Sequence, residues 1–288
     1  TLDGTLFPYT TLFRSPLDEI RPFVEAGRVS FPVAVMYGMI RRLDRGVEQV
    51  LDALRRMGLE ENTVVVFSSD NGPQFVSELG PIPRFNCHFN GRKGTTYEGG
   101  VRVPAIVRWP AGGLTGGRRE NAFLHMVDWY PTLLSLAGLP AWAPNALDGI
   151  DQSRMLRGES GTVNPKRFWQ WNRYRPTVFS NAAMRDGDWK LVRPEFHPVH
   201  QVLPEDLRRD HAMRYEPEAV TDILTDPLPC VEVTAPPPLE LYDLRVDPQE
   251  RHNRAADQPD RVRRMSDELE AWFESVERDR RATGEARE

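Results

Sequence analysis

A long amphipathic segment, followed at once by a short β-branched run, constrains the fold of this chain more than any other feature. Apolar side chains recur every three or four positions from residue 36, which predicts a helix with one apolar face. That face consists of Met36, Ile40, Leu43, Val47, Val50, Leu51 and Leu54. Gly58 stands where a helix-terminating glycine belongs, and residues 63–67 (TVVVF) then predict a strand buried on both faces. A helix, a turn and a buried strand together indicate an α/β layer fold.

Two further elements are expected before residue 140. Residues 101–109 predict a second strand, and Pro104 within it implies an edge position or a bulge. A helix is expected to begin near Asp128, with Pro131 in its first turn and Gly138 just past its end. The segment from residue 138 to residue 165 is rich in proline and glycine and is therefore interpreted as a connection.

The last third of the chain has a different character. Residues 188–192 and 239–243 predict short strands, and a final helix carries one apolar stripe. That stripe consists of Val262, Met265, Leu269, Trp272, Phe273 and Val276. We therefore expect an α/β domain over residues 16–150 and a small α+β subdomain over residues 166–288. Residues 1–15 predict no amphipathic element and remain unassigned; we expect them to be non-native sequence.

Composition excludes some partners and leaves others open. A formal net charge of -5 provides no basic field for nucleic acid, and no apolar run reaches the roughly 18 residues of a membrane span. Cys87 and Cys230 lie far apart and form no C-x-x-C motif, so their spacing establishes no disulfide. Only Lys93, Lys166 and Lys190 are lysines among 37 basic residues, which makes each lysine informative.

The sequence SSDNG at residues 68–72 directly follows the predicted strand. Ligand sites of open α/β sheets gather at the carboxyl ends of strands. Asp70 offers a carboxylate and Asn71 an amide oxygen, which are hard ligands suited to Ca²⁺ or Mg²⁺. A plain turn is the alternative interpretation, because Asp-Asn-Gly is also a common turn sequence.

Residues 91–104 (GRKGTTYEGGVRVP) combine four glycines with three cationic side chains. Glycine lets backbone approach a ligand closely, and Arg92, Lys93 and Arg102 place positive charge beside it, which suits an oxyanion. A solvated basic loop is the alternative. The spacing of Thr95 and Glu98 matches a capping box, but two glycines follow instead of an apolar helical run, so we reject that interpretation.

Taken together, SSDNG and GRKGTTYEGGVRVPAIVRWP resemble the sulfatase family of the alkaline-phosphatase-like superfamily. The resemblance continues through HMVDWYPTLLSLAGLP, LDGID, NAAMRDGDWKLVRP and ELYDLRVDPQERHN, and it thins between Leu203 and Pro237. It implies the C-terminal portion of such a protein. The expected fold is a partial alkaline-phosphatase-like sandwich, with a mixed sheet flanked by helices, followed by the small α+β subdomain.

The resemblance assigns roles to a few residues. Asp70 and Asn71 match two metal ligands that usually bind Ca²⁺, with Mg²⁺ as a possible substitute. Lys93 matches the lysine that contacts the substrate sulfate, so it is the candidate catalytic and substrate-binding residue. His88, near the basic loop, is a second candidate substrate contact. Glu98 and Arg102 lie in the same motif and are interpreted as structural, and Lys190 is interpreted as a packing or strand residue of the subdomain.

One departure from the family pattern limits the expected activity. The family takes its nucleophile, formylglycine, from a Cys/Ser-x-Pro-x-Arg motif, and no such motif occurs in the chain. The other pair of metal-binding aspartates is also absent. We therefore expect a fragment of a sulfuric-ester hydrolase that binds part of the metal and the sulfate group but is inactive alone. The nucleophile is expected in a missing N-terminal segment.

Alternatives remain open. A phosphodiesterase or phosphonate monoester hydrolase of the same superfamily would share the metal scaffold, and a non-catalytic sulfatase-like binding protein would share the loop. The spacing of His197 and His200 could suit two ligands of one metal ion on a helix, but Pro198 between them disrupts helical spacing. The resemblance suggests a periplasmic or secreted protein acting on a sulfate ester, whose identity the sequence leaves open together with the oligomeric state.

Overall fold

The computed structural model describes residues 17–77, 80–83, 85–140, 147–159, 166–220 and 232–282. The predictions for residues 1–15 and for Cys230 therefore lie outside the described residues. The chain divides into two compact units. One comprises Leu43–Asp70 and Val103–Arg167, and the other comprises Thr1–Arg42, Asn71–Arg102 and Phe168–Glu288.

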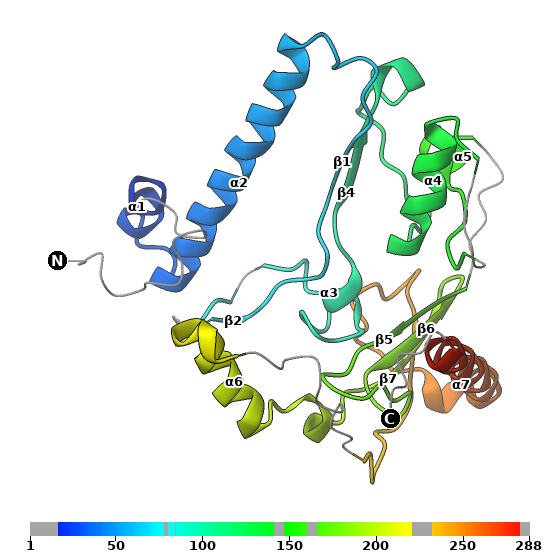
Figure 1. The fold of residues 1–288 in the computed structure, drawn as a ribbon. Helices are drawn as coiled ribbons and strands as arrows, with labels where there is room; N and C mark the ends of the chain where they lie inside the picture. The colour runs from blue at the N-terminus through cyan, green and yellow to red at the C-terminus, as the bar shows by residue number, and fades with distance from the viewer. Residues whose placement is uncertain are drawn as a thin grey trace. The chain divides into compact units, whose positions relative to one another are not determined.

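The smaller unit is built on an antiparallel strand pair (Figure 1). Strand β1 (Val65–Ser68) pairs with β4 (Ala105–Arg108) in the register Val65↔Arg108, and Ser68 Oγ donates to the Pro104 carbonyl at 2.9 Å. The predicted strand therefore exists, but all four β1 residues are only half-buried, so the expectation of burial on both faces was wrong. Within the described residues β1 has a single neighbouring strand, which covers one edge and neither face.

Short helices complete the core of this unit. Helix α4 (Trp129–Leu136) begins directly after Asp128 and is followed by Gly138 at φ +69°, as the sequence predicted. Asp128 was also expected to cap this helix, but its carboxylate instead accepts from the His125 and Ile150 amides. Helix α5 (Ser153–Leu156) falls in the segment expected to be a connection. The unit buries a small apolar cluster of Leu114, Leu136, Met155 and Leu156.

The first two helices are α1 (Leu17–Glu25) and α2 (Phe31–Arg56). The predicted helix therefore begins five residues earlier than expected and ends before Gly58, which has φ +68°. Its buried residues are Val33, Ala34 and Gly38. Of the seven residues of the expected apolar face, Ile40, Leu43 and Val50 are exposed and the other four are half-buried.

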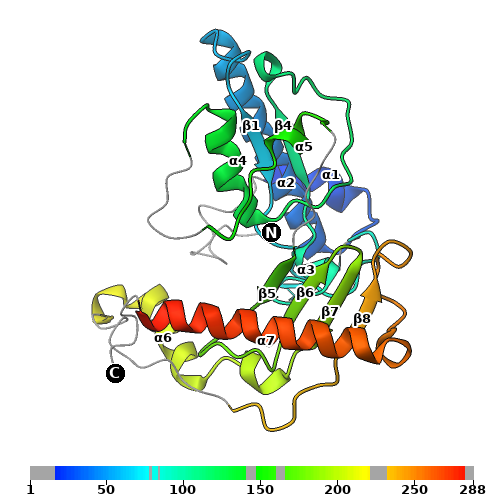
Figure 2. The same ribbon diagram turned by 90° about the vertical axis from the view of Figure 1, so that its right-hand side faces the viewer.

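The larger unit contains a four-stranded sheet in the order β5-β6-β7-β8. Its strands are β5 (Arg167–Gln170), β6 (Ala182–Asp186), β7 (Trp189–Arg193) and β8 (Glu240–Asp243). Strand β7 pairs antiparallel with β6 (Leu191↔Met184) and with β8 (Leu191↔Leu241). Helix α7 (Pro259–Ala282) lies across the strands (Figure 2). The predicted strands at 188–192 and 239–243 and the predicted final helix are thereby confirmed.

The two faces of this sheet bury different partners. On one face Leu191 and Met184 pack with Met265 and Leu269 of α7. On the other, Val192 and Tyr242 pack with Tyr97, which belongs to the glycine-rich segment. Because side chains alternate along a strand, Lys190 shares the face of Val192 and so lies on the side of that segment.

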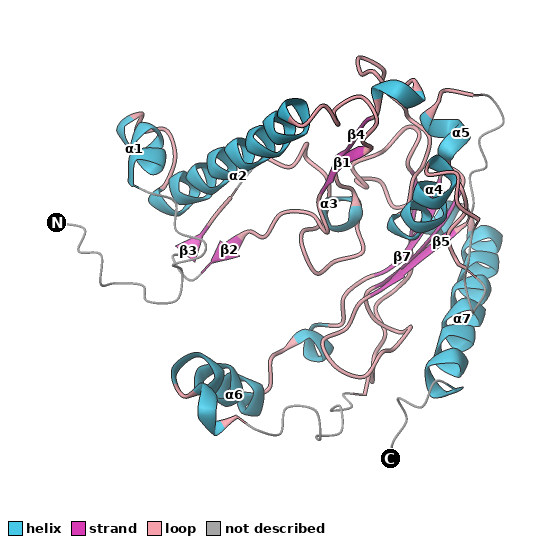
Figure 3. Cartoon of the chain, turned by 45° about the horizontal axis from the view of Figure 1, so that its top comes forward, coloured by secondary structure: helices cyan, strands magenta, loops and turns pink. Residues whose placement is uncertain are grey.

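The remaining elements of the larger unit are short or polar, and Figure 3 separates them from the loops by colour. They are α3 (Glu98–Val101), β2 (Val76–Ser77), β3 (Gly80–Pro81) and α6 (Pro204–Tyr215). The predicted strand at 101–109 therefore begins only at Ala105, since residues 98–101 form a helical turn. That turn has no side-chain cap, in agreement with the rejected capping box. Among the described helices, none combines the length and apolarity that a bilayer crossing requires.

Candidate functional site

The loop around Lys93 is closed by its own hydrogen bonds. Gly91 and Gly94 have φ of +81° and +86°, a conformation that glycine adopts without steric cost. Thr95 Oγ1 accepts from the Arg92 amide at 3.0 Å and donates to the Arg92 carbonyl at 2.8 Å. Lys93 lies at the exposed tip of this turn, and no carboxylate among the described residues pairs with its ammonium. The tip therefore presents a positive charge to solvent.

The segment after Asn71 is hydrogen-bonded to this loop. The Lys93 amide donates to the Pro73 carbonyl at 3.0 Å, and the Gly72 amide donates to the Gly100 carbonyl at 2.8 Å. The two backbones approach so closely that a Cβ at Gly72 would lie 1.9 Å from the Gly99 carbonyl oxygen. The structure thus joins the segment of Asn71 to the loop of Lys93, although about twenty residues separate them.

The two candidate metal ligands stand on either side of a structural boundary. Asp70 is the last residue of its segment in the smaller unit, and Asn71 is the first of its segment in the larger one. The Asn71 side-chain amide donates from Nδ2 to the Gly72 carbonyl at 2.9 Å. This bond orients the side-chain amide.

The donor chemistry fits part of a calcium shell. Carboxylate and amide oxygens are the ligands that Ca²⁺ and Mg²⁺ prefer, and Ca²⁺ takes six to eight of them. Within the described part of the chain, no group of three or more His, Cys, Asp or Glu side chains is placed to hold a metal ion. Two side chains such as Asp70 and Asn71 would supply only a minority of the oxygens that such an ion needs.

The candidate histidines have local partners. His88 is exposed with φ +62°, its carbonyl accepts from Arg251, and its ring meets Phe85 edge-on at 5.1 Å. His197 and His200 lie in a 3-10 turn. The His200 ring stacks on Trp171 at 5.3 Å, so packing accounts for it.

Lys190 forms a buried ion cluster with Glu98 and Glu250; the sequence indicated structural roles for Lys190 and Glu98 but gave no sign of Glu250. Lys190 Nζ is 2.9 Å from Glu98 Oε1 and 3.0 Å from Glu250 Oε1, and the three side chains are 0–4% exposed. Glu250 Oε2 also accepts the Glu98 backbone amide at 2.6 Å. The second oxygen of Glu98 faces the half-exposed Arg102, whose guanidinium is 3.5 Å away, so Lys190 is the buried cation that the two carboxyls share.

The two carboxyls respond differently to that arrangement. Burial acts to raise the pKa of Glu98, but the charge of Lys190 and its hydrogen bond outweigh burial and hold that pKa below its usual range. Burial raises the pKa of Glu250 and prevails over the attraction of Lys190. Glu98 is therefore the firm partner of the ammonium, and Glu250 is the carboxyl that takes up a proton first.

Asn181 makes the second set of bonds to the loop. Its Oδ1 accepts the Thr96 amide at 3.0 Å, and its Nδ2 donates to the Gly94 carbonyl at 2.8 Å and to the Trp171 carbonyl at 2.9 Å. The side chain is fully buried between the sheet and the loop. The only sequence signal for this role was its place at the start of NAAMRDGDWK, before a strand that the sequence did not predict.

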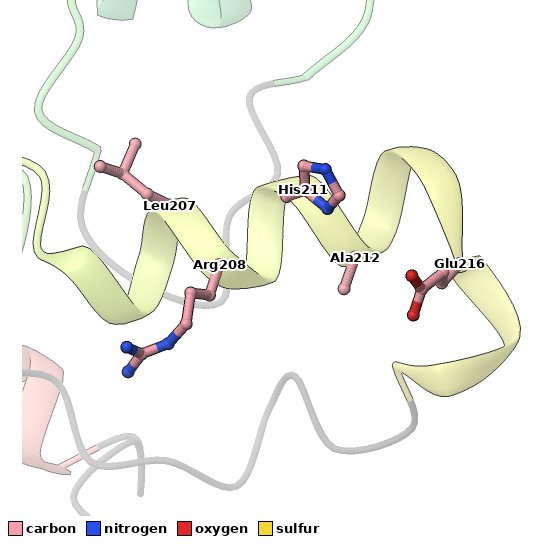
Figure 4. Close-up of a pocket in the computed structure, with 5 residues that line it drawn as sticks. All are labelled: Leu207, Arg208, His211, Ala212 and Glu216. Carbon is pink, nitrogen blue, oxygen red and sulfur yellow. The ribbon is translucent and has the colours of Figure 1, made fainter.

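Helix α6 carries a separate hollow. Figure 4 shows its lining side chains, all on or just after one helix: Leu207, Arg208, His211, Ala212 and Glu216. No side chain of α6 is buried, and the hollow contains none of the candidate residues from the sequence. It therefore adds nothing to the site around Lys93.

The chain is similar to known proteins both in sequence and in fold. The sulfatase family model matches residues 24–139. Human arylsulfatase A is 34% identical over 219 residues, which is 74% of this chain and 38% of that protein. The structure of a Pseudoalteromonas sulfatase matches with TM-score 0.57 and 25% identity, over 85% of this chain and 43% of the other. Phosphonate monoester hydrolase of Agrobacterium radiobacter matches with TM-score 0.53 and 23% identity, over 84% and 41%.

These matches define the fold and the extent of the similarity. The solved structures have the alkaline-phosphatase-like fold that the sequence predicted, and the mixed α/β structure of this chain corresponds to it. The chain spans less than half the length of the curated relatives it matches.

Proposed function

Since the chain belongs to the sulfatase family, we propose that it serves the hydrolysis of sulfuric esters by presenting Lys93 to the sulfate group. One observation carries this proposal. The Lys93 ammonium lies at the tip of a loop fixed by hydrogen bonds, without a carboxylate partner in the described structure, and the backbone of that loop is bonded to the segment of Asn71. An unpaired ammonium beside an oxygen-donor segment suits a divalent cation and an oxyanion bound together.

Each group has a distinct part in this proposal. Lys93 offsets the charge that builds on the sulfate oxygens as the S–O bond breaks, and an oriented group of this kind contributes about 3–4 kcal/mol. Asp70 and Asn71 would hold part of a Ca²⁺ or Mg²⁺ shell, and such an ion, when bound, polarises a sulfate oxygen. His88 is proposed as a second contact to the substrate.

The nucleophile is the part that this sequence does not encode. The family's formylglycine derives from Cys/Ser-x-Pro-x-Arg, which occurs nowhere in the 288 residues. Covalent catalysis needs the attacking atom itself. We therefore expect the chain on its own to bind sulfate without turning over a sulfate ester. We expect calcium affinity no tighter than millimolar, and micromolar binding in calorimetry would contradict this expectation.

The similar proteins favour a sulfate ester as the substrate and keep a phosphonate ester as the second candidate. Sulfatases dominate the curated relatives, and the family suggests a periplasmic or secreted site of action. The similarity to a phosphonate monoester hydrolase supports the runner-up, because a phosphonate is also a tetrahedral oxyanion. A non-catalytic binding protein would use the same loop without any nucleophile.

The three lysines permit a direct test. Lys93 and Lys166 are exposed and Lys190 is fully buried, so reductive methylation with [¹³C]formaldehyde labels the first two and leaves the third as an internal blank. We expect added sulfate to slow the methylation of Lys93 and not that of Lys166. Equal slowing at both lysines, or at neither, would refute the proposed sulfate site.

The same assay separates the candidate substrates. Methylphosphonate that protects Lys93 at lower concentrations than sulfate would favour the phosphonate hydrolase. The Lys93→Met variant serves as the control for signal assignment, since it removes one labelled amine and leaves the loop glycines in place.

A further inference from the structure

Backbone strain in this protein gathers around the loop that carries Lys93. Among the described residues, the non-glycine residues with positive φ are Cys87, His88, Asn181 and Glu250. Side chains rarely adopt this conformation, and it persists only where the surrounding structure enforces it. Cys87 and His88 directly precede the loop in the chain. Asn181 and Glu250 come from the C-terminal part and contact the loop.

Asn181 fixes the loop on both sides of Thr95. It accepts from the Thr96 amide and donates to the Gly94 carbonyl, so one buried side chain closes the turn that follows Lys93. Its backbone is itself held in place, because its amide donates to the Pro194 carbonyl and its carbonyl accepts from the Trp171 amide. Asparagine tolerates this φ better than most residues, but the energetic cost remains.

The ion cluster fixes the far end of the loop. Glu250 accepts the Glu98 amide through one oxygen and faces Lys190 through the other. Lys190 in turn holds the Glu98 carboxylate. The cluster extends from β7 to the first residue of α3, and all three side chains are shielded from solvent.

We propose that Asn181 and the ion cluster of Glu98, Lys190 and Glu250 are positioning groups that hold Lys93 where it meets the sulfate oxyanion. Neither set of residues touches the Lys93 ammonium. Each restrains the loop backbone beyond it, and small displacements of a binding group are costly when geometry carries the interaction. This inference rests on the proposed function, because it assigns the C-terminal sheet a part in the same sulfate site.

The variant that tests this inference is Asn181→Gly. Glycine suits the positive φ at this position, so the substitution relieves backbone strain while it deletes the bonds to the loop. Cys87→Gly is the matched control. Cys87 has φ +61°, is exposed and carries a free thiol, so this substitution relieves similar strain without removing a side-chain bond to the loop.

Amide hydrogen exchange supplies the structural readout. We expect Asn181→Gly to speed the exchange of the Thr96 and Lys93 amides at least tenfold, while the core amides of Met184 and Leu191 change less than threefold. The Lys93 amide is the decisive probe, because it donates to Pro73 and not to Asn181. Its acceleration would show that the displacement reaches Lys93.

Sulfate protection of Lys93 from methylation supplies the functional readout. Positioning predicts at least a fivefold weaker protection in Asn181→Gly and no change in Cys87→Gly. Equal acceleration of loop and core amides would overturn the inference, since it would indicate a general stabilising role. Unchanged protection despite a loosened loop would overturn it as well.

Failure of the proposed function has a different signature. If sulfate does not protect Lys93 even in the unsubstituted chain, the sulfate site itself falls. The positioning of Lys93 is then judged from amide exchange alone: a Lys93 amide that stays slow in Asn181→Gly overturns it, and a fast one upholds it for whatever anion the loop binds.

Discussion

Replacement of Lys190 by methionine tests the energetic reasoning most severely. Methionine keeps the length and apolar stem of the side chain but removes the ammonium that lies 2.9 Å from Glu98 and 3.0 Å from Glu250. Glu250 would then lose its counter-charge, and Glu98 would keep Arg102, which lies 3.5 Å from its Oε2 at the edge of the cluster. Breaking a buried ion pair in this way costs about 3–5 kcal/mol, against a total stability of about 5–15 kcal/mol for a typical domain.

The assay is urea unfolding followed by far-ultraviolet circular dichroism at pH 7. We expect Lys190→Met to lower the free energy of unfolding by about 3–5 kcal/mol. The control Lys166→Met, at an exposed position, should stay within about 0.5 kcal/mol of the unsubstituted chain. A loss of less than about 1 kcal/mol in Lys190→Met would refute the reasoning, because it would mean that the carboxylates reach water or other cations.

Two further measurements separate charge from packing. The triple variant Lys190→Met, Glu98→Gln, Glu250→Gln removes all three charges and should recover most of the lost stability, because neutral groups carry no ionic desolvation cost. The deficit of the single variant should also shrink from pH 7 to pH 5. Burial already raises the pKa of the Glu250 carboxyl in the folded state, and loss of the attraction of Lys190 would raise that pKa further, so the folded protein would bind the proton more tightly as pH falls.

Three more predictions follow from other parts of the molecule. Gly99→Ala would place a Cβ 2.4 Å from the Asn90 carbonyl oxygen and should lower the free energy of unfolding by about 1–3 kcal/mol in the same urea assay. Gly46→Ala, in the open middle of α2, should instead raise it by about 0.5–1 kcal/mol. Burial and a hydrogen bond to the shared Glu240 carboxylate raise the pKa of both Tyr97 and Tyr242, so the stability that they contribute below about pH 10 should be lost above it. Absorbance at about 295 nm should show both phenols ionising only when the protein unfolds. Burial lowers the pKa of His125, so the contribution of this residue to stability should be present above about pH 6.5 and lost as pH falls below it. The free energy of unfolding of His125→Asn should therefore depend less on pH across this range than that of the unsubstituted chain.

Sequence periodicity predicted the elements that bury one clear face. The stripe of α7 packs Met265 and Leu269 into the core of the larger unit, and β7 and β8 were expected within one residue of their observed bounds. Strand β6 was missed because Ala182 and its neighbours are small or polar and carry no strand pattern; pairing with β7 creates that strand. Helix α6 was missed because it has no buried residues and therefore no apolar stripe.

The residues of the candidate site also fall into those that the sequence indicated and those that it did not. The sequence indicated Asn71 and Lys93 because each lies in a short motif whose chemistry can be recognised locally. It gave no sign that Asn181 and Glu250 bond to the loop, since hydrogen bonds across 85 and 152 residues leave no local pattern. A positive φ at glutamate is likewise imposed by tertiary contacts, whereas at glycine it can be expected from the residue type.

The long sequence separation of these bonds has a consequence for the order of folding. The loop around Lys93 is synthesised well before its partners, which follow it by 85 residues for Asn181, 92 for Lys190 and 152 for Glu250. Closing such distant contacts carries an entropic cost that local structure does not repay, so they form late. On a ribosome the loop would therefore acquire its final shape only after Glu250 has left the exit tunnel. The proposed anion site would mature as one of the last events of folding, whatever the speed at which the helices form.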